Sequence, residues 1–188
     1  EENAKNVVIS SLKNLEYRGY DSAGIALLTG DEITLYKSKG KIANLEEKLI
    51  NKDIKSSTAI AHTRWATHGE PNEMNAHPHK VGFVTLVHNG IIENYIDLKE
   101  FLTKENVEFV SSTDTEVACA YINYIYEKSN EKDNKIKILK EACNNFRGSF
   151  AFNVIFDNEP NIIYATRKDS PLVIGLSDKG NFAASDMS

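Results

Sequence analysis

The order of the apolar patterns along the chain is the feature that most restricts its fold. Three segments with helical periodicity follow one another between residues 95 and 146, and strand-like runs stand before and after this block. A parallel sheet of βαβ units requires strands and helices to alternate, which this order does not provide. We therefore predict an α+β fold whose strands pair in antiparallel fashion.

Local signals define the individual elements. Residues 3–17 have apolar side chains near helical spacing, and Gly19 follows them. The runs at 24–29 and 32–38 are joined by Thr-Gly-Asp, which is typical of a hairpin turn. The other predicted elements are helices at 42–50, 95–105, 114–128 and 134–146, and strands at 58–65, 83–89, 149–156, 161–166, 171–176 and 181–185. No segment has the composition of a linker, so we predict one compact domain.

Composition excludes several classes of function. The net charge of −5 argues against the basic surface that binds a nucleic acid backbone. No apolar run is long enough to cross a bilayer, and the polar opening EENAKN does not resemble a signal peptide. The two cysteines, Cys119 and Cys143, lie far apart in helical segments and do not suggest a disulfide framework. These features predict a cytoplasmic domain that binds a small metabolite, and neither nucleic acid nor a membrane.

The densest polar cluster is the segment HTRWATHGEPNEMNAHPH at residues 62–79. It follows a predicted strand and contributes most of a long connection, 66–82, of a kind that is more often functional than idle. A surface loop with hydrogen-bonded histidines is an equally open interpretation. Histidines of this segment and His88 could also form a tetrahedral zinc site. Because no HExxH or CxxC motif is present, we rank a zinc-binding or zinc-hydrolase domain last.

Three shorter motifs each have a structural and a functional interpretation. HNGIIEN at 88–94 indicates first a turn at Asn-Gly, although the same pair could direct two N–H donors at an oxyanion. SSTDTE at 111–116 predicts a helix N-cap at Thr113 or Asp114, and a carboxylate there could also hold an ammonium group. YRGYDSAG at 17–24 predicts a helix exit with a salt bridge between its Arg and its Asp.

Taken together and in this order, these motifs resemble the glutaminase domain of the glutamine–fructose-6-phosphate aminotransferase family, which belongs to the class II amidotransferases. RGSFAF, SPLVIGL and ASD near the end of the sequence extend the resemblance to nearly the whole chain. The run at 62–79 is specific to this family within the class. The resemblance implies a four-layer αββα sandwich of two antiparallel sheets, the fold of N-terminal-nucleophile hydrolases.

The resemblance also implies a nucleophile that precedes residue 1. Family members begin with a Cys-Gly-Ile-Val-Gly segment whose first cysteine attacks the substrate and uses its own α-amino group as the base. We therefore expect residues 1–188 to form the glutaminase domain without this first strand, and without the sugar isomerase domains of the family. Cys119 and Cys143 are expected to be buried structural thiols on helices, with raised pKa values.

The substrate-binding residues carry over by resemblance. Arg64 would bind the α-carboxylate of glutamine in a forked pair, and Thr67 and His68 would add contacts nearby. Asp114 would bind the α-ammonium group. Glutamine, a zwitterion with an amide tail, would thus meet a cation, an anion and hydrogen-bond donors.

The catalytic residues carry over in the same way. Asn89 and Gly90 would form the oxyanion hole. Trp65 resembles the family's gate residue, which controls the exit of ammonia, and Arg18 resembles an arginine that organises the amino-terminal region. The implied reaction is hydrolysis of L-glutamine to glutamate and ammonia through a γ-glutamyl thioester, with no metal or organic cofactor.

The resemblance further implies where the ammonia goes. It would serve the conversion of fructose 6-phosphate to glucosamine 6-phosphate in the isomerase domain of the same polypeptide, and the full-length enzyme would be a homodimer. Two alternatives stay open. One is the glutaminase of another class II enzyme, namely amidophosphoribosyltransferase, asparagine synthetase or glutamate synthase. The other is a non-catalytic glutamine- or glutamate-binding module, which would bind ligand without releasing ammonia.

Overall fold

The computed structural model describes residues 3–66 and 69–186. The elements in this part of the chain are, in order, α1 (Ala4–Leu15), the 3-10 turn η1 (Glu16–Arg18), β1 (Ser22–Thr29), β2 (Glu32–Lys39), α2 (Ile42–Leu49), β3 (Ala59–Arg64), β4 (His79–Val81), β5 (Val84–Ile92), α3 (Tyr95–Lys104), α4 (Asp114–Lys128), α5 (Lys135–Asn144), β6 (Gly148–Phe156), β7 (Tyr164–Lys168), β8 (Val173–Ser177) and β9 (Gly180–Ala184). The predicted helices and all eight predicted strands therefore have counterparts in this part of the chain.

The strands of the described residues form three antiparallel sheets. The first has the order β2-β1-β3, the second β4-β5-β6-β7, and β8 pairs with β9 in a separate hairpin. The longest ladder joins β5 to β6 and sets Asn89 opposite Ala151 and Gly90 opposite Phe150. This ladder includes the first five residues of the HNGIIEN motif, where β5 pairs with β6 alone because β4 reaches only Val84–Leu86.

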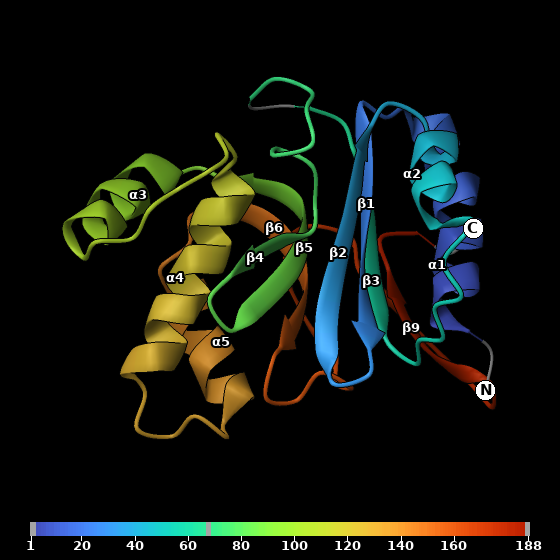
Figure 1. Cartoon of the computed structure of the whole chain (residues 1–188). Helices are drawn as coiled ribbons and strands as arrows, with labels where there is room; N and C mark the ends of the chain where they lie inside the picture. Colours follow the sequence, from blue (N-terminus) through green and yellow to red (C-terminus); the bar gives the residue numbers. More distant parts are fainter. Residues whose placement is uncertain (1–2, 67–68, 187–188) are drawn as a thin grey trace.

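Four layers build the body of the molecule (Figure 1). Helices α1 and α2 cover the outer face of the first sheet, and α4 and α5 cover the outer face of the second. Between the two sheets lies a small apolar cluster made of Ala26, Ile60, Val87 and Ile155. Each of these two sheets has a helix-covered face and a face toward the other, which confirms the predicted α+β sandwich and explains its continuous apolar strands.

The structure corrects the sequence-based elements at three places. The long connection at 66–82 contains a short strand, β4, on the edge of the second sheet. β8 and β9 pair only with each other among the described residues, so two main sheets do not account for every strand. The turn interpretation of Asn89-Gly90 is wrong, because β5 runs through both residues while paired to β6.

The start of α4 follows the predicted capping pattern. Thr113 is the N-cap, and its hydroxyl accepts a hydrogen bond of 3.1 Å from the Glu116 N–H. Asp114 is the first residue of the helix and its carboxylate is therefore not needed for the cap.

Among all helices in the described part of the chain, none combines the length and apolar character that a membrane crossing requires.

Candidate active site

A cleft of about 1330 Å³ opens beside the inner sheets, bounded by β3, β5, β6 and the β8–β9 hairpin. Six of the eight predicted site residues line it, and they come from four separate segments of the chain. They are Arg18, Arg64, Trp65, Asn89, Gly90 and Asp114. The other two, Thr67 and His68, lie outside the described residues.

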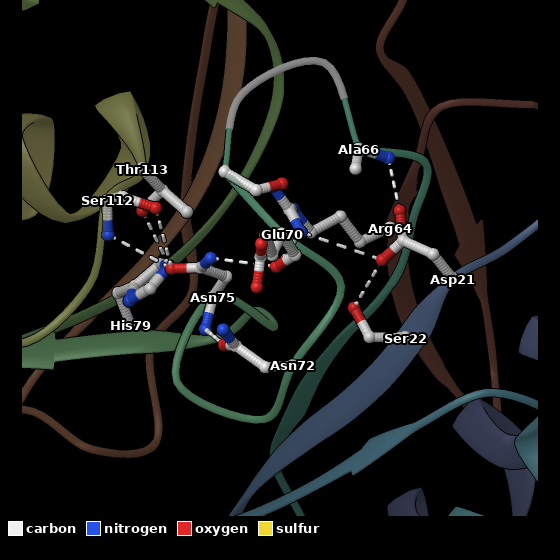
Figure 2. A network of polar contacts seen from close by, with 11 residues as sticks. Asp21, Ser22, Arg64, Ala66, Glu70, Asn72, Asn75, His79, Ser112 and Thr113 are labelled. Carbon is white, nitrogen blue, oxygen red and sulfur yellow. Dashed lines mark hydrogen bonds and ion pairs between the residues drawn. The ribbon is translucent and has the colours of Figure 1, made fainter.

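Arg64 is the buried cation of this cleft. It ends β3, only 5% of its surface is exposed, and its guanidinium lies 3.6 Å from the Asp21 carboxylate. The guanidinium also donates to the backbone carbonyls of Gly69 at 3.3 Å and Glu70 at 3.5 Å. Figure 2 shows Arg64 between Asp21 and Glu70, so these contacts hold the guanidinium between the residue that precedes β1 and the connection that follows β3.

Asp21 ties this connection to the first sheet. Its carboxylate accepts hydrogen bonds from the Ala66 N–H and, at 2.9 Å, from the Ser22 hydroxyl, while its own N–H donates to the Arg64 carbonyl at 2.7 Å. The partner of Asp21 is therefore Arg64, and the predicted salt bridge inside the YRGYDSAG motif is not formed. Sequence spacing favoured the nearer arginine, whereas strand pairing of Ser22 with Arg64 brings the more distant one closer.

Arg18 pairs instead with the far end of the chain. Its guanidinium forms an ion pair with Asp186 and donates to the Ser185 hydroxyl at 3.1 Å. The Tyr17 hydroxyl also donates to Asp186, at 2.9 Å. The first and last motifs of the sequence are thus joined at the rim of the cleft.

Trp65 lies across the YRG segment while remaining largely exposed. A Cβ placed on Gly19 would lie only 1.9 Å from the indole ring, so a larger residue at this position would displace the indole. Gly19 also has a φ of +91°, which disfavours other residues. Gly19 of the YRGYDSAG motif therefore leaves room for the indole ring of Trp65 at the mouth of the cleft.

Asn89 and Gly90 lie on the wall of the cleft formed by β5. The Asn89 side-chain amide makes no hydrogen bond to the described residues, so it is free to face a ligand in the cleft. Gly90 has a φ of +131°, and an added Cβ would lie 2.1 Å from the Ser149 carbonyl of β6. Gly90 is required here by backbone conformation and by close packing against β6.

Asp114 supplies a buried carboxylate on another wall. One carboxylate oxygen accepts the Ile92 N–H at 2.8 Å, where β5 ends. The other lies 3.5 Å from the Thr115 hydroxyl. The end of β5 and the start of α4 therefore hold this carboxylate in the cleft that Asn89 and Gly90 also line.

Four histidines pack between these walls. The rings of His62 and His77 stack at 4.2 Å, and His77 lies parallel to His88 at 6.5 Å. His79 contacts the Thr113 hydroxyl at 3.0 Å, and His88 contacts the Thr115 hydroxyl at 2.9 Å. These rings support the segment that begins α4.

Burial keeps all four imidazoles neutral. It lowers the pKa of His62 to about 3, helped by nearby His88 and Arg64, and it lowers the pKa of His88 to about 4. It also holds the pKa values of His77 and His79 well below the usual range, since neighbouring cations and imidazoles add to the effect. Among the described residues, no group of three or more His, Cys, Asp or Glu side chains is arranged to hold a metal ion.

Neither Cys119 nor Cys143 lines the cleft. Cys119 is buried on α4 with its thiol 3.3 Å from the Val84 carbonyl, and burial raises its pKa to about 12. Burial also raises the pKa of Cys143 to about 11. Both thiols are poor nucleophiles at neutral pH, which confirms the structural role predicted for them.

Several residues that shape the site gave only weak signals in the sequence. Asp21 stood in a recognised motif but was assigned the wrong partner, and Asn75 was one polar residue among many in the segment 62–79. Ser112 and Thr115 were visible only as helix-start residues. Their importance arises from contacts across more than 20 positions of sequence, which no local pattern reports.

The fold and this site define a class of protein. A family model described as a glutamine amidotransferase domain matches residues 62–188, which is more than half of the chain. The chain therefore belongs to the glutamine amidotransferase domain family. Among solved structures, glutamine phosphoribosylpyrophosphate amidotransferase from B. subtilis, bound to ADP and GMP, has a TM-score of 0.82 and 25% identity, covering 98% of this chain and 40% of that one.

Two relatives share more of the sequence of this chain than that solved structure does. The isomerizing glutamine–fructose-6-phosphate aminotransferase of Clostridium acetobutylicum is 46% identical over 186 residues, which is 98% of this chain and 30% of the relative. The enzyme of the same name from Methanosarcina acetivorans is 50% identical over 192 residues, or 98% of this chain and 31% of the relative. The chain thus spans about 30% of the length of these relatives.

Proposed function

We propose that this chain is a glutaminase domain that releases ammonia from L-glutamine. The observation that carries the proposal is the meeting of a buried cation, a buried carboxylate and a strand-borne amide pair in one cleft. Glutamine presents the complementary set, a carboxylate and an ammonium on one carbon and a carboxamide at the other end. A cleft with these three features selects such a zwitterion by charge and by shape.

Each wall has its own role in this proposal. Arg64 binds the α-carboxylate of glutamine, and Asp114 binds the α-ammonium group. Asn89 and Gly90 stabilise the oxyanion that forms when the amide carbonyl is attacked. Thr67 and His68 add contacts to the substrate. The Asn89 amide is suited to its role because it does not contribute a hydrogen bond to the folded structure of the described residues.

The thiol nucleophile in this proposal is a cysteine that precedes residue 1 in the natural protein. Cys119 and Cys143 do not suit the reaction, since both lie outside the cleft lining and have raised pKa values. Attack of a thiolate on the carboxamide carbon forms a tetrahedral intermediate, which expels ammonia and leaves a γ-glutamyl thioester. Water then hydrolyses the thioester to glutamate and regenerates the thiol.

The strand edges around the cleft support this source of the nucleophile. β3 is the last strand of its sheet and β9 the last of its hairpin among the described residues, and both line the cleft. An extended segment between them could pair with backbone groups on either side, as added strands do.

Trp65 and Arg18 complete the site in this proposal. The Trp65 indole, seated on Gly19 at the cleft mouth, gates the exit of ammonia. The Arg18–Asp186 pair organises the amino-terminal segment by fixing the end of β9. Trp65 controls the exit from the site and Arg18 orders the amino-terminal segment, so both contribute less to the chemical step than Asn89 does.

The proposal extends to the whole protein. Its ammonia serves the conversion of fructose 6-phosphate to glucosamine 6-phosphate by an isomerase domain of the same polypeptide. This follows from the 43–50% identity to enzymes named for that reaction. We also propose that the full-length enzyme is a homodimer and is cytoplasmic, in keeping with two free cysteines in the described chain.

The test uses the natural full-length protein and measures glutamate and ammonia released from L-glutamine. A diazoketone analogue of glutamine, which alkylates an activated amino-terminal cysteine, should add one label, located by peptide mass spectrometry before residue 1. With fructose 6-phosphate present, glucosamine 6-phosphate should form. Binding of glutamine without ammonia release would instead identify a binding module, and hydrolysis without the sugar product would identify another class II glutaminase.

A further inference from the structure

We infer that Asn75 is a positioning residue that sets the distance between Arg64 and Asp114, and thereby selects substrates with an α-amino acid head group. The inference rests on the proposed glutaminase function. Asn75 is 3% exposed and is not part of the cleft lining. It therefore acts through the residues on its two sides, which Figure 2 shows.

One end of the Asn75 side chain supports the Arg64 wall. Its amide nitrogen donates to the Glu70 carbonyl at 2.8 Å. The same carbonyl accepts from the Arg64 guanidinium at 3.5 Å, and the Gly69 carbonyl accepts from it at 3.3 Å. Asn75 and Arg64 thus share one backbone group, so a shift of that group moves the guanidinium.

The other end of the Asn75 side chain supports the Asp114 wall. Its amide oxygen accepts from the Ser112 N–H at 3.0 Å and lies 3.3 Å from the Ser112 hydroxyl. Ser112 stands two residues before Asp114, and Thr113 between them caps α4. The backbone that delivers the carboxylate is therefore attached to the same side chain that supports Arg64.

Gly69 shows how closely these walls are joined. An added Cβ on this residue would lie 2.3 Å from the Ser112 hydroxyl and 2.8 Å from the Asn75 amide nitrogen. Gly69 also has a φ of +79°, which favours glycine. The backbone that Arg64 contacts is thus in direct contact with both Asn75 and Ser112.

The chemistry of an amide suits this linking role. A primary amide donates from its nitrogen and accepts at its oxygen, whereas a carboxylate only accepts and an apolar side chain does neither. The carboxylate and the ammonium of glutamine stand on one carbon, so their separation is fixed. If the link is lost, Arg64 and Asp114 no longer match that separation, and the site discriminates less against amides that lack one charge.

The experiment compares two amides with the natural full-length protein and its variants. L-glutamine carries both charges, and glutaramic acid is the same molecule without the α-ammonium group. In Asn75→Asp, the donor to the Glu70 carbonyl becomes an acceptor. We expect KM for glutamine to rise about 10- to 100-fold with little change in kcat, and the kcat/KM preference for glutamine over glutaramic acid to fall about tenfold or more.

Asn72→Asp is the matched control. It introduces the same charge in the same connection and keeps the oxygen that accepts the Asn75 N–H, at 2.8 Å. Its preference for glutamine should equal that of the unsubstituted protein. Gly69→Ala places a methyl group against Ser112 and Asn75 and leaves residue 75 unsubstituted. It is therefore an independent second variant, and its preference for glutamine over glutaramic acid should fall in the same way.

The outcomes separate this inference from the function on which it rests. If the unsubstituted protein does not hydrolyse glutamine, the proposed function is wrong and the inference is overturned with it. If it does, an unchanged preference in Asn75→Asp and Gly69→Ala would overturn the inference alone. Loss of the thermal unfolding transition in both variants would assign Asn75 to stability, and would overturn it too.

Discussion

The two sides of the candidate site are built in different ways. Asn89 and Gly90 lie on β5, in a nine-residue strand paired to β6 and packed against the apolar cluster under α4. Arg64 and the connection after it are held by a polar network that includes Asp21 and Asn75. Apolar packing fixes the first side, and directional contacts among polar groups fix the second.

The difference indicates how the two sides respond to change. A strand that is paired to its neighbour and anchored by buried apolar residues is held closely in place, so it suits groups that must meet the reacting atom within a fraction of an ångström. A polar network can adapt its contacts, so it suits recognition of charged substrate groups. We therefore expect substitutions at Asn89 and Gly90 to change mainly kcat, and substitutions at Arg64 and Asn75 to change mainly KM. The following substitutions test that division.

Gly90→Ala should have the largest effect. The new Cβ meets the Ser149 carbonyl at 2.1 Å, and φ of +131° disfavours alanine by about 1–3 kcal/mol before the clash is added. Glutamine hydrolysis should fall by more than about 10³-fold, because both oxyanion donors lose their position. Urea unfolding and steady-state kinetics of the natural protein measure the two effects.

The control for Gly90→Ala is Gly30→Ala. Gly30 has a φ of +63°, but nothing lies within 4 Å of its Cβ position, so this variant carries the backbone strain without the clash. It should lose some stability and keep its activity. Similar activities for the two variants would contradict the placement of Gly90 beside the reacting atom.

Asn89→Ala should lower kcat by about 10²- to 10³-fold and leave KM nearly unchanged. The reason is that the amide is proposed to bind an oxyanion that exists only during the reaction. Thermal stability should change little, since the side chain makes no hydrogen bond to the described residues. A rise in KM without a fall in kcat would show that Asn89 binds the substrate itself and not the oxyanion.

Arg64→Lys should raise KM for glutamine about 10- to 100-fold and change kcat less. A lysine ammonium cannot match the forked geometry of the guanidinium that contacts Asp21, Gly69 and Glu70. Steady-state kinetics measure both constants. Arg167→Lys, on β7 outside the cleft lining, is the control and should behave as the unsubstituted protein does. If Arg167→Lys raised KM equally, the role proposed for Arg64 in binding glutamine would be wrong.

Acid should destabilise the protein through the histidines between the two sides. Burial lowers the pKa of His62 to about 3 and of His88 to about 4, whereas unfolded histidine titrates near 6.5. Below pH 6.5 the unfolded chain binds more protons, so stability is lost as the pH falls toward these values. Each such histidine contributes a slope of about 1.4 kcal/mol per pH unit.

Urea unfolding at pH 7.5, 6.0 and 5.0 measures this slope. Replacing His77 with Gln removes one of the neutral rings, so that variant should lose less stability between pH 6.0 and 5.0 than the unsubstituted protein, even if it starts from a lower value. An unchanged slope in His77→Gln would show that other groups cause the acid sensitivity.

The comparison also separates what sequence could predict from what it could not. The helices at 95–146 and the strands of β1 and β2 follow from periodicity and turn residues, because these signals act over a few positions. The Asn-Gly pair was misread as a turn, since the β6 partner that extends β5 is more than 50 residues away. Local propensity was overridden there by pairing in the sheet.

The same division applies to the site residues. The motif resemblance predicted that Arg64, Asn89 and Asp114 would act together, and the structure brings them to one cleft. Thr67 and His68 remain predictions, because they lie outside the described residues. The partners of the arginines were not predictable, since Arg18 is 168 positions from Asp186 and Arg64 reaches back to Asp21 across a sheet.

By itself, the sequence determined the α+β class, the order of the elements and the residue types available for glutamine chemistry. These properties depend on local periodicity, on capping residues and on motifs that can be compared one by one. Only the tertiary structure decided that β5 continues through Gly90, that Asp21 serves Arg64, and that Asn75 joins the two sides. The physical reason is that ion pairs, amide links and sheet ladders depend on distances in space, which the packing of four layers sets.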